Sequence, residues 1–147
     1  MSDKISSKQA VTMYDHDPDA TDATDVEWVD MRDFDTFMAM VMLSVPAGGK
    51  ISAFTILANA ESDGGGTDVT VKTHALGSDP DAVGDYVFLE CTAAEIKQAA
   101  VDAGVDSVRY VSASVTVNQA GAECVVTYIR DAAKFARAGL TADNIAA

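Results

Sequence analysis

Residues 34–60 decide the fold class of this chain, and they read FDTFMAMVMLSV (34–45), PAGG (46–49) and KISAFTILANA (50–60). The first run is apolar on both parities, with one side formed by Met38, Met40 and Met42 and the other by Phe37, Val41, Leu43 and Val45. A strand that is apolar on both parities is expected to be covered on both faces. Met and Ala also favour a helix. We favour a strand, because the Pro-Gly turn and a second β-rich run follow at once and indicate a hairpin.

Further strands are predicted by β-branched and aromatic runs that turn residues separate. They cover residues 10–14, 26–31, 68–75, 86–91, 107–117 and 123–130. A Gly-rich hairpin tip is expected at residues 64–66, and another hairpin turn at Asn118–Gly121. One helix near 92–103 is predicted by the capping box of Thr92 and Glu95, with Gly104 suited to its C-terminus.

These elements predict a mainly all-β fold, an antiparallel β-sandwich of jelly-roll-like type with one short α-helix and extended termini. The length of 147 residues fits a single domain. We expect an Asp-rich N-terminal arm or loop (1–24), the β-sandwich domain (25–131) and a C-terminal arm (132–147). Whether the N-terminal segment adds a strand to its own sheet or to a neighbour's stays open at this point.

The charge of the chain narrows the choice of partners. Ten Lys and Arg oppose 23 Asp and Glu, which gives a net charge of −13. Nucleic acid and anionic membrane surfaces are therefore not expected as partners, because both are held by clustered cations. The longest apolar run, residues 37–47, is well short of the ~20 residues that cross a bilayer. The polar start has no apolar signal region, so we expect a soluble protein or part of a soluble assembly.

Motifs that carry chemistry are weak in this sequence. Asp15, Asp17 and Asp19 resemble the opening of a calcium loop, but the Gly and Glu that an EF-hand needs are replaced by Ala20 and Val26. A calcium site of another kind at these aspartates stays open. Cysteines 91 and 124 lie in apolar runs, lack the spacing of a zinc site, and are expected to be buried thiols. We expect no catalytic residue, cofactor or metal, and therefore no enzyme.

Two stretches together resemble a known class of protein: residues 34–75 and residues 108–139. Their order of paired apolar strands, Gly-rich tip, alternating strand, capped helix and last strand pair is similar to capsid decoration (cement) proteins of tailed bacteriophages. The resemblance implies a non-enzymatic virion component, made in the host cytoplasm and placed on the outer capsid surface. It implies binding to the lattice of the major capsid protein, bridging of capsid subunits, and a homo-oligomer, either a trimer or a dimer.

For the partner interface we expect two groups of residues. One lies in the C-terminal arm and the other is the methionine side of the 34–45 strand; they are Phe135, Arg137, Leu140 and Ile145, and Met38, Met40 and Met42. Two alternatives remain: a head–tail connector or tail structural protein, and a soluble carbohydrate- or calcium-binding β-sandwich module.

Overall fold

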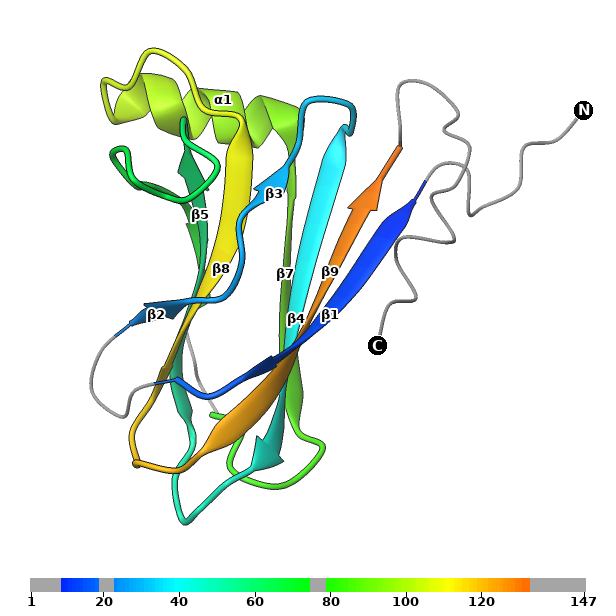
Figure 1. Cartoon of the computed structure of the whole chain (residues 1–147), viewed down its shortest axis with the longest axis vertical. Coiled ribbons are helices and arrows are strands. Elements are labelled where there is room, and N and C mark those ends of the chain that lie inside the picture. The colour runs from blue at the N-terminus through cyan, green and yellow to red at the C-terminus, as the bar shows by residue number, and fades with distance from the viewer. Residues whose placement is uncertain (1–8, 19–22, 75–78, 133–147) are drawn as a thin grey trace, which may run out of the picture.

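The computed structural model describes residues 9–18, 23–74 and 79–132, and it contains two antiparallel sheets and one short helix (Figure 1). The strands are β1 (Ala10–His16), β2 (Thr24–Asp25), β3 (Val29–Asp30), β4 (Thr36–Val45), β5 (Ile51–Asn59), β6 (Val69–Thr73), β7 (Tyr86–Thr92), β8 (Tyr110–Val117) and β9 (Glu123–Asp131). The helix is α1 (Ala93–Asp102). The prediction of a mainly β sandwich with one helix is confirmed.

The strand order is that of a jelly roll. The first sheet runs β1-β9-β4-β7 and the second runs β2-β8-β5-β6, with β3 also paired to β8. Counting β2 and β3 as one broken strand, the first strand pairs with the last, the second with the last but one, and so on inward. This nesting folds one long antiparallel hairpin over itself into two packed sheets.

The connections correct two predictions made from turn residues. The turn after β4 is present, since Gly49 N–H donates to Pro46 C=O at 2.7 Å, and Ala47 and Gly48 have φ of 49° and 79°. It does not close a hairpin, because β4 and β5 belong to different sheets; the turn at residues 118–121 likewise joins β8 to β9 across the sandwich. Turn chemistry specifies a chain reversal but not a hydrogen-bonded partner. The Gly-rich tip does join a true hairpin of β5 and β6.

Two further boundaries differ from the prediction. Residues 10–16 form β1 and pair with β9 of the same chain, so they belong to the sandwich rather than to an N-terminal arm. The strand expected at 26–31 is broken into the two-residue strands β2 and β3. The three-part division of the chain otherwise stays a prediction.

The core lies between the inner faces of the two sheets. Along β4, Phe37, Ala39, Val41 and Leu43 are fully buried, and from β5 they meet Ile51, Phe54 and Ile56. The period-2 alternation of β-strands explains why every second residue of β4 enters the core. Burial of large apolar side chains is the main source of stability for such a sandwich.

Tyr128 of β9 ties the two sheets together. Its hydroxyl accepts the N–H of Ala113 on β8 at 2.7 Å and lies 3.3 Å from Ser112 Oγ. This bond fills the gap in the ladder of β8 between its pairings with β2 and β3. The ring makes edge contacts with Tyr14 and Phe37, at 5.2 and 5.1 Å between centroids. Burial raises the pKa of the Tyr128 phenol to about 12.

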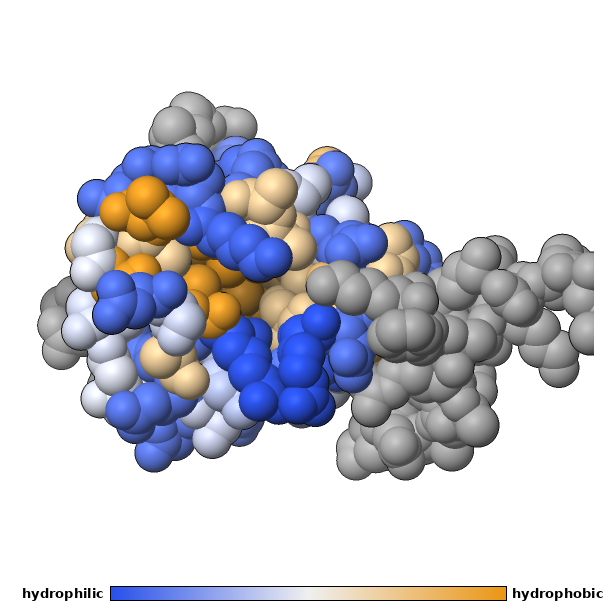
Figure 2. All heavy atoms as spheres, turned by 90° about the horizontal axis from the view of Figure 1, so that it is seen from above, coloured by the Kyte–Doolittle hydropathy of each residue, from blue (hydrophilic) through white to orange (hydrophobic). Residues whose placement is uncertain are grey.

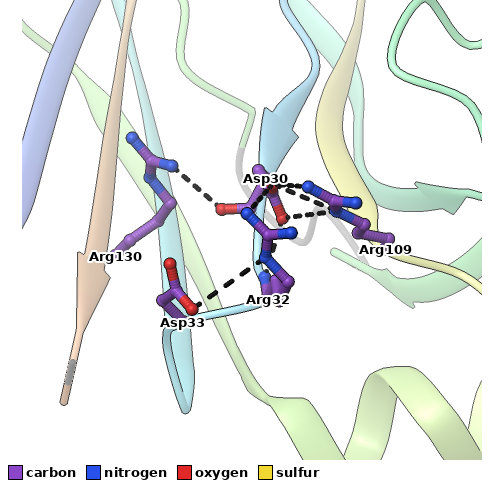
Figure 3. Close-up of polar contacts among 5 residues, drawn as sticks. All are labelled: Asp30, Arg32, Asp33, Arg109 and Arg130. Carbon is purple, nitrogen blue, oxygen red and sulfur yellow. Dashed lines mark hydrogen bonds and ion pairs between the residues drawn. The ribbon is translucent and has the colours of Figure 1, made fainter. Parts of the chain in front are cut away.

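Asp30 of β3 forms a second tie, and all three arginines of the described residues meet there (Figure 3). Its carboxylate accepts two bonds from Arg109 Nε, at 3.1 and 3.0 Å, and its carbonyl accepts from Arg130 Nη1 of β9 at 2.9 Å. The backbone N–H of Arg32 donates to the same carboxylate at 2.8 Å. Burial alone would raise the pKa of Asp30, but these bonds and charges outweigh it and lower the pKa.

The helix lies across one end of the sandwich and packs against β6 and β7 (Figure 1). Thr92 and Glu95 form the predicted capping box, with bonds of 3.1 and 2.7 Å. Its own residues Ile96 and Ala100 are buried. Figure 2 looks onto this end of the molecule and shows apolar residues gathered in its middle with hydrophilic residues around them.

Candidate docking face

The outer face of the first sheet carries apolar side chains from all four of its strands. We call these nine residues the methionine face: Val11, Met13, Met38, Met40, Met42, Tyr86, Phe88, Val125 and Ile129. They come from segments as far apart in sequence as β1 and β9, and the sheet order brings them side by side.

The strand register arranges this face in three rows. The central row crosses the sheet as Met13, Thr127, Met40 and Phe88. The row nearer α1 is Val11, Ile129, Met38 and Glu90, and the row nearer the other end is Asp15, Val125, Met42 and Tyr86. Directly opposed side chains in such a ladder have Cβ atoms about 4.5–5.5 Å apart. Nine of the twelve side chains in these rows are apolar, and Thr127, Glu90 and Asp15 are the exceptions, so the rows form a mainly apolar surface.

No element of the described residues covers this surface. Met13 is 64% exposed, Phe88 52% and Tyr86 60%, while the three methionines of β4 are half-buried against their neighbours in the sheet. The described residues cover only one face of β4, so the prediction that both faces are covered stays untested for the outer face. The second sheet packs against the side of β4 that carries Phe37 and Leu43. In a fold of two layers, the other side of β4, which carries the methionines, faces outward.

Carboxylates surround the methionine face, and cations are absent from it within the described residues. Asp15, Glu90 and Asp131 stand in or next to its rows, and Glu123 follows at its far end. The four strands of this sheet contain a single cation, Arg130, whose side chain turns inward to the carbonyl of Asp30. The face is therefore apolar in its middle and negative at its ends.

A hollow of ≈ 570 Å³ opens at the α1 end of the methionine face. Met38 and Ile129 line its apolar side, and Glu90, Glu95 and Asp131 are among its acidic residues. Lys72 of β6 reaches into the same hollow and donates to the Glu90 carbonyl at 2.8 Å. The hollow therefore joins an apolar side to an acidic side, and Lys72 offsets part of that acidic charge through its ion pair with Glu95 at 3.5 Å.

The structure brings together one of the two groups expected at an interface. Met38, Met40 and Met42 lie on the methionine face, whereas Phe135, Arg137, Leu140 and Ile145 lie outside the described residues. Sequence reasoning missed Met13, Tyr86 and Phe88. The sequence predicted a strand at residues 86–91, but only the pairing of β7 with β4 shows that Tyr86 and Phe88 extend the methionine side.

The remaining candidate groups are the two cysteines and the aspartates of the calcium-like loop. Cys91 and Cys124 are buried free thiols, as expected, and burial raises the pKa of each to about 12, which keeps them protonated at neutral pH. Within the described ranges, no three His, Cys, Asp or Glu side chains are placed to hold a metal ion. Asp19, part of the calcium-loop resemblance, is outside those ranges. No helix in the described part of the chain has the length and apolar character to cross a membrane.

Comparison with known proteins finds a structural likeness but no related sequence. No family model and no curated protein matches the sequence. Among solved structures, the chain is similar to a chain in the structure of infectious bursal disease virus Gx strain, with a TM-score of 0.41 and 11% sequence identity. The match covers 84% of this chain and 32% of that one, so this chain spans about a third of the length of the viral chain.

Proposed function

We propose that this chain is a non-enzymatic structural protein of a virion, a decoration (cement) protein that binds the outer surface of an assembled capsid. The observation that carries the proposal is the methionine face. Contiguous apolar patches larger than a few hundred Å² are rare on proteins that act alone, and they mark contact surfaces. Methionine suits such a surface, because its flexible thioether adapts to an irregular partner.

The charge pattern supports an outward position on the particle. A net charge of −13 opposes contact with packaged nucleic acid and suits a surface that faces water and salt. The carboxylates around the methionine face favour a capsid site that is apolar in its middle and carries Lys or Arg around it. The same carboxylates oppose pairing of two methionine faces. A dimer or trimer of this chain would therefore form through other surfaces.

Binding of this kind would stabilise a capsid by linkage. A protein that binds the assembled lattice, and not free subunits, adds its binding free energy to assembly. Many copies that each touch neighbouring capsid subunits gain further from the high effective concentration on a particle. The major capsid protein is the partner that this mechanism requires.

A copy-number measurement tests the assignment to the lattice. Capsid-sized particles would be purified from the source, and this chain quantified against the most abundant particle protein. Stoichiometry comparable with that protein supports a decoration role. Trace amounts would move the assignment to a head–tail connector or tail protein, and absence from particles would overturn the virion assignment in favour of a soluble binding module.

A pair of variants tests the methionine face itself. Met40→Glu places a charge in its central row, and Val101→Glu places the same charge on α1, where Val101 is 71% exposed and apolar. Both variants should fold, because both positions face outward. Particles that lack the protein should rebind the Val101→Glu variant like the native chain and lose affinity for Met40→Glu by at least about tenfold, the cost of a desolvated unpaired carboxylate. Equal binding of the two variants would exclude the methionine face as the contact.

A further inference from the structure

Residues 133–147 come directly after β9, a strand of the methionine face, and the direction of the backbone changes at Ala132. β9 ends at Asp131, which lines the hollow at the α1 end of that face. The next residue, Ala132, has a φ of 53°, in the left-handed region that non-Gly residues seldom adopt. The extended path of β9 therefore stops at the rim of the hollow, and the remaining 15 residues start from there.

The composition of this segment complements the hollow and the face. It reads AKFARAGLTADNIAA, with cations Lys134 and Arg137 on either side of Phe135. Leu140 and Ile145 lie further along, together with one carboxylate, Asp143. The hollow is apolar at Met38 and Ile129, and around them its three carboxylates outnumber its single cation, Lys72. Opposite charges at short range fix the register of such a contact and speed its formation.

The lengths also match. Phe135 lies four residues after Asp131, a reach of up to ~13 Å, and the whole segment can extend to ~50 Å. The three rows of the methionine face span only about 14 Å along β4, given a rise of ~3.4 Å per residue. The segment can therefore reach the hollow with Phe135 and still cross the face.

We propose that residues 133–147 dock on the methionine face of their own chain, with Phe135 in the hollow beside Met38 and Lys134 and Arg137 against its carboxylates. Attachment directly after β9 gives the segment a high effective concentration at this face, which a second copy in dilute solution does not have. The docked segment shields apolar surface that otherwise favours association between copies. This proposal concerns the chain alone. The segment and a capsid would compete for the same face, so the segment would leave the face when a capsid binds.

The test uses the full chain with methyl-labelled methionine, which gives six methyl signals in NMR spectra. Phe135→Leu keeps an apolar side chain but removes the aromatic ring current, and Phe135→Asp removes docking. Both changes should move the methyl signal of Met38, and Phe135→Asp should also move those of Met40 and Met42. Met31, buried in the core, should stay unchanged and report that the variants are folded.

Three outcomes decide the proposal. Docking within one chain is supported if the Met38 methyl signal shifts in both Phe135 variants by the same amount in dilute and concentrated samples. It is also supported if the double variant Lys134→Glu, Arg137→Glu shifts the Met38 signal in the same direction by a smaller amount. An unchanged Met38 signal in both Phe135 variants overturns the proposal. A shift that appears only at high protein concentration also overturns it, because the occupant is then the segment of a second copy.

Discussion

Met40 of β4 and Phe88 of β7 lie directly opposite each other on paired strands, with both side chains on the outer face of the first sheet. Phe88 is 52% exposed, although aromatic side chains contribute most when buried. The pair continues across Thr127 to Met13 on β1, so it belongs to an apolar row that crosses the whole sheet. An exposed apolar row of this kind is typical of a surface that another surface covers, either the capsid or residues 133–147 in the two proposals above.

Neighbouring residues on β4 should differ sharply in their effect on stability. Phe37 is fully buried and Met38 is half-buried on the other face. Phe37→Ala should lower the free energy of unfolding by about 3–5 kcal/mol, through lost burial and the cavity left behind. Met38→Ala should lower it by about 1 kcal/mol or less. Urea unfolding of the two variants checks this, and equal losses would mean that the outer face is as closely packed as the core.

Removal of the Tyr128 hydroxyl should destabilise the sandwich without disturbing its ring contacts. Tyr128→Phe leaves the N–H of Ala113 without its acceptor in a buried setting. The expected loss is about 1–3 kcal/mol in the free energy of unfolding. Tyr86→Phe is the matched control, because Tyr86 is 60% exposed, and it should change stability by less than about 0.5 kcal/mol. Chemical denaturation of both variants makes the comparison.

The free energy of unfolding should fall at alkaline pH, and ionisation of the two buried thiols should be the first cause of this fall. Burial raises the pKa of Cys91 and Cys124 from 9.0, and that of Tyr128 from 10.0, to about 12 in each case. A raised folded pKa means that the unfolded chain ionises first, so stability is complete below pH 9 and is lost as pH rises toward 12. Replacement of both cysteines by alanine should delay the decline until pH 10. Unfolding free energies measured between pH 8 and pH 11.5 test this, and an unchanged onset would contradict it.

The Asp30 cluster should show the opposite pH dependence. Its lowered pKa means that the carboxylate stabilises the fold above its ordinary pKa of 3.8, and that this contribution is lost as pH falls through the folded value. Asp30→Asn should therefore be less stable than the native chain at pH 7, with the difference shrinking below pH 4. Asp106→Asn is the control, because Asp106 is exposed, and it should match the native chain at both pH values. A difference that is the same at pH 7 and pH 3 would assign the effect of Asp30 to its shape rather than to its charge.

Local sequence patterns predicted most elements of the fold. The alternation of residues 68–75 anticipated β6, the β-rich run 86–91 anticipated β7, and the Thr92–Glu95 box anticipated the start of α1. Each of these patterns involves residues that are only a few positions apart in the sequence, so the sequence alone shows it. The broken strand at residues 24–30 was missed because β2 and β3 are held by their pairing with β8 rather than by their own propensity.

The sequence by itself determined that residues 36–45 form a strand with methionines on one side, that the chain is strongly acidic, and that turns follow β4 and β8. Only the tertiary structure decided which side of β4 faces the core, because both sides are apolar and a period of two cannot choose between them. The nested strand order made that choice by packing the second sheet against Phe37 and Leu43. The same order placed β1, β7 and β9 beside the methionines, and so assembled from distant segments a face that no local pattern contains.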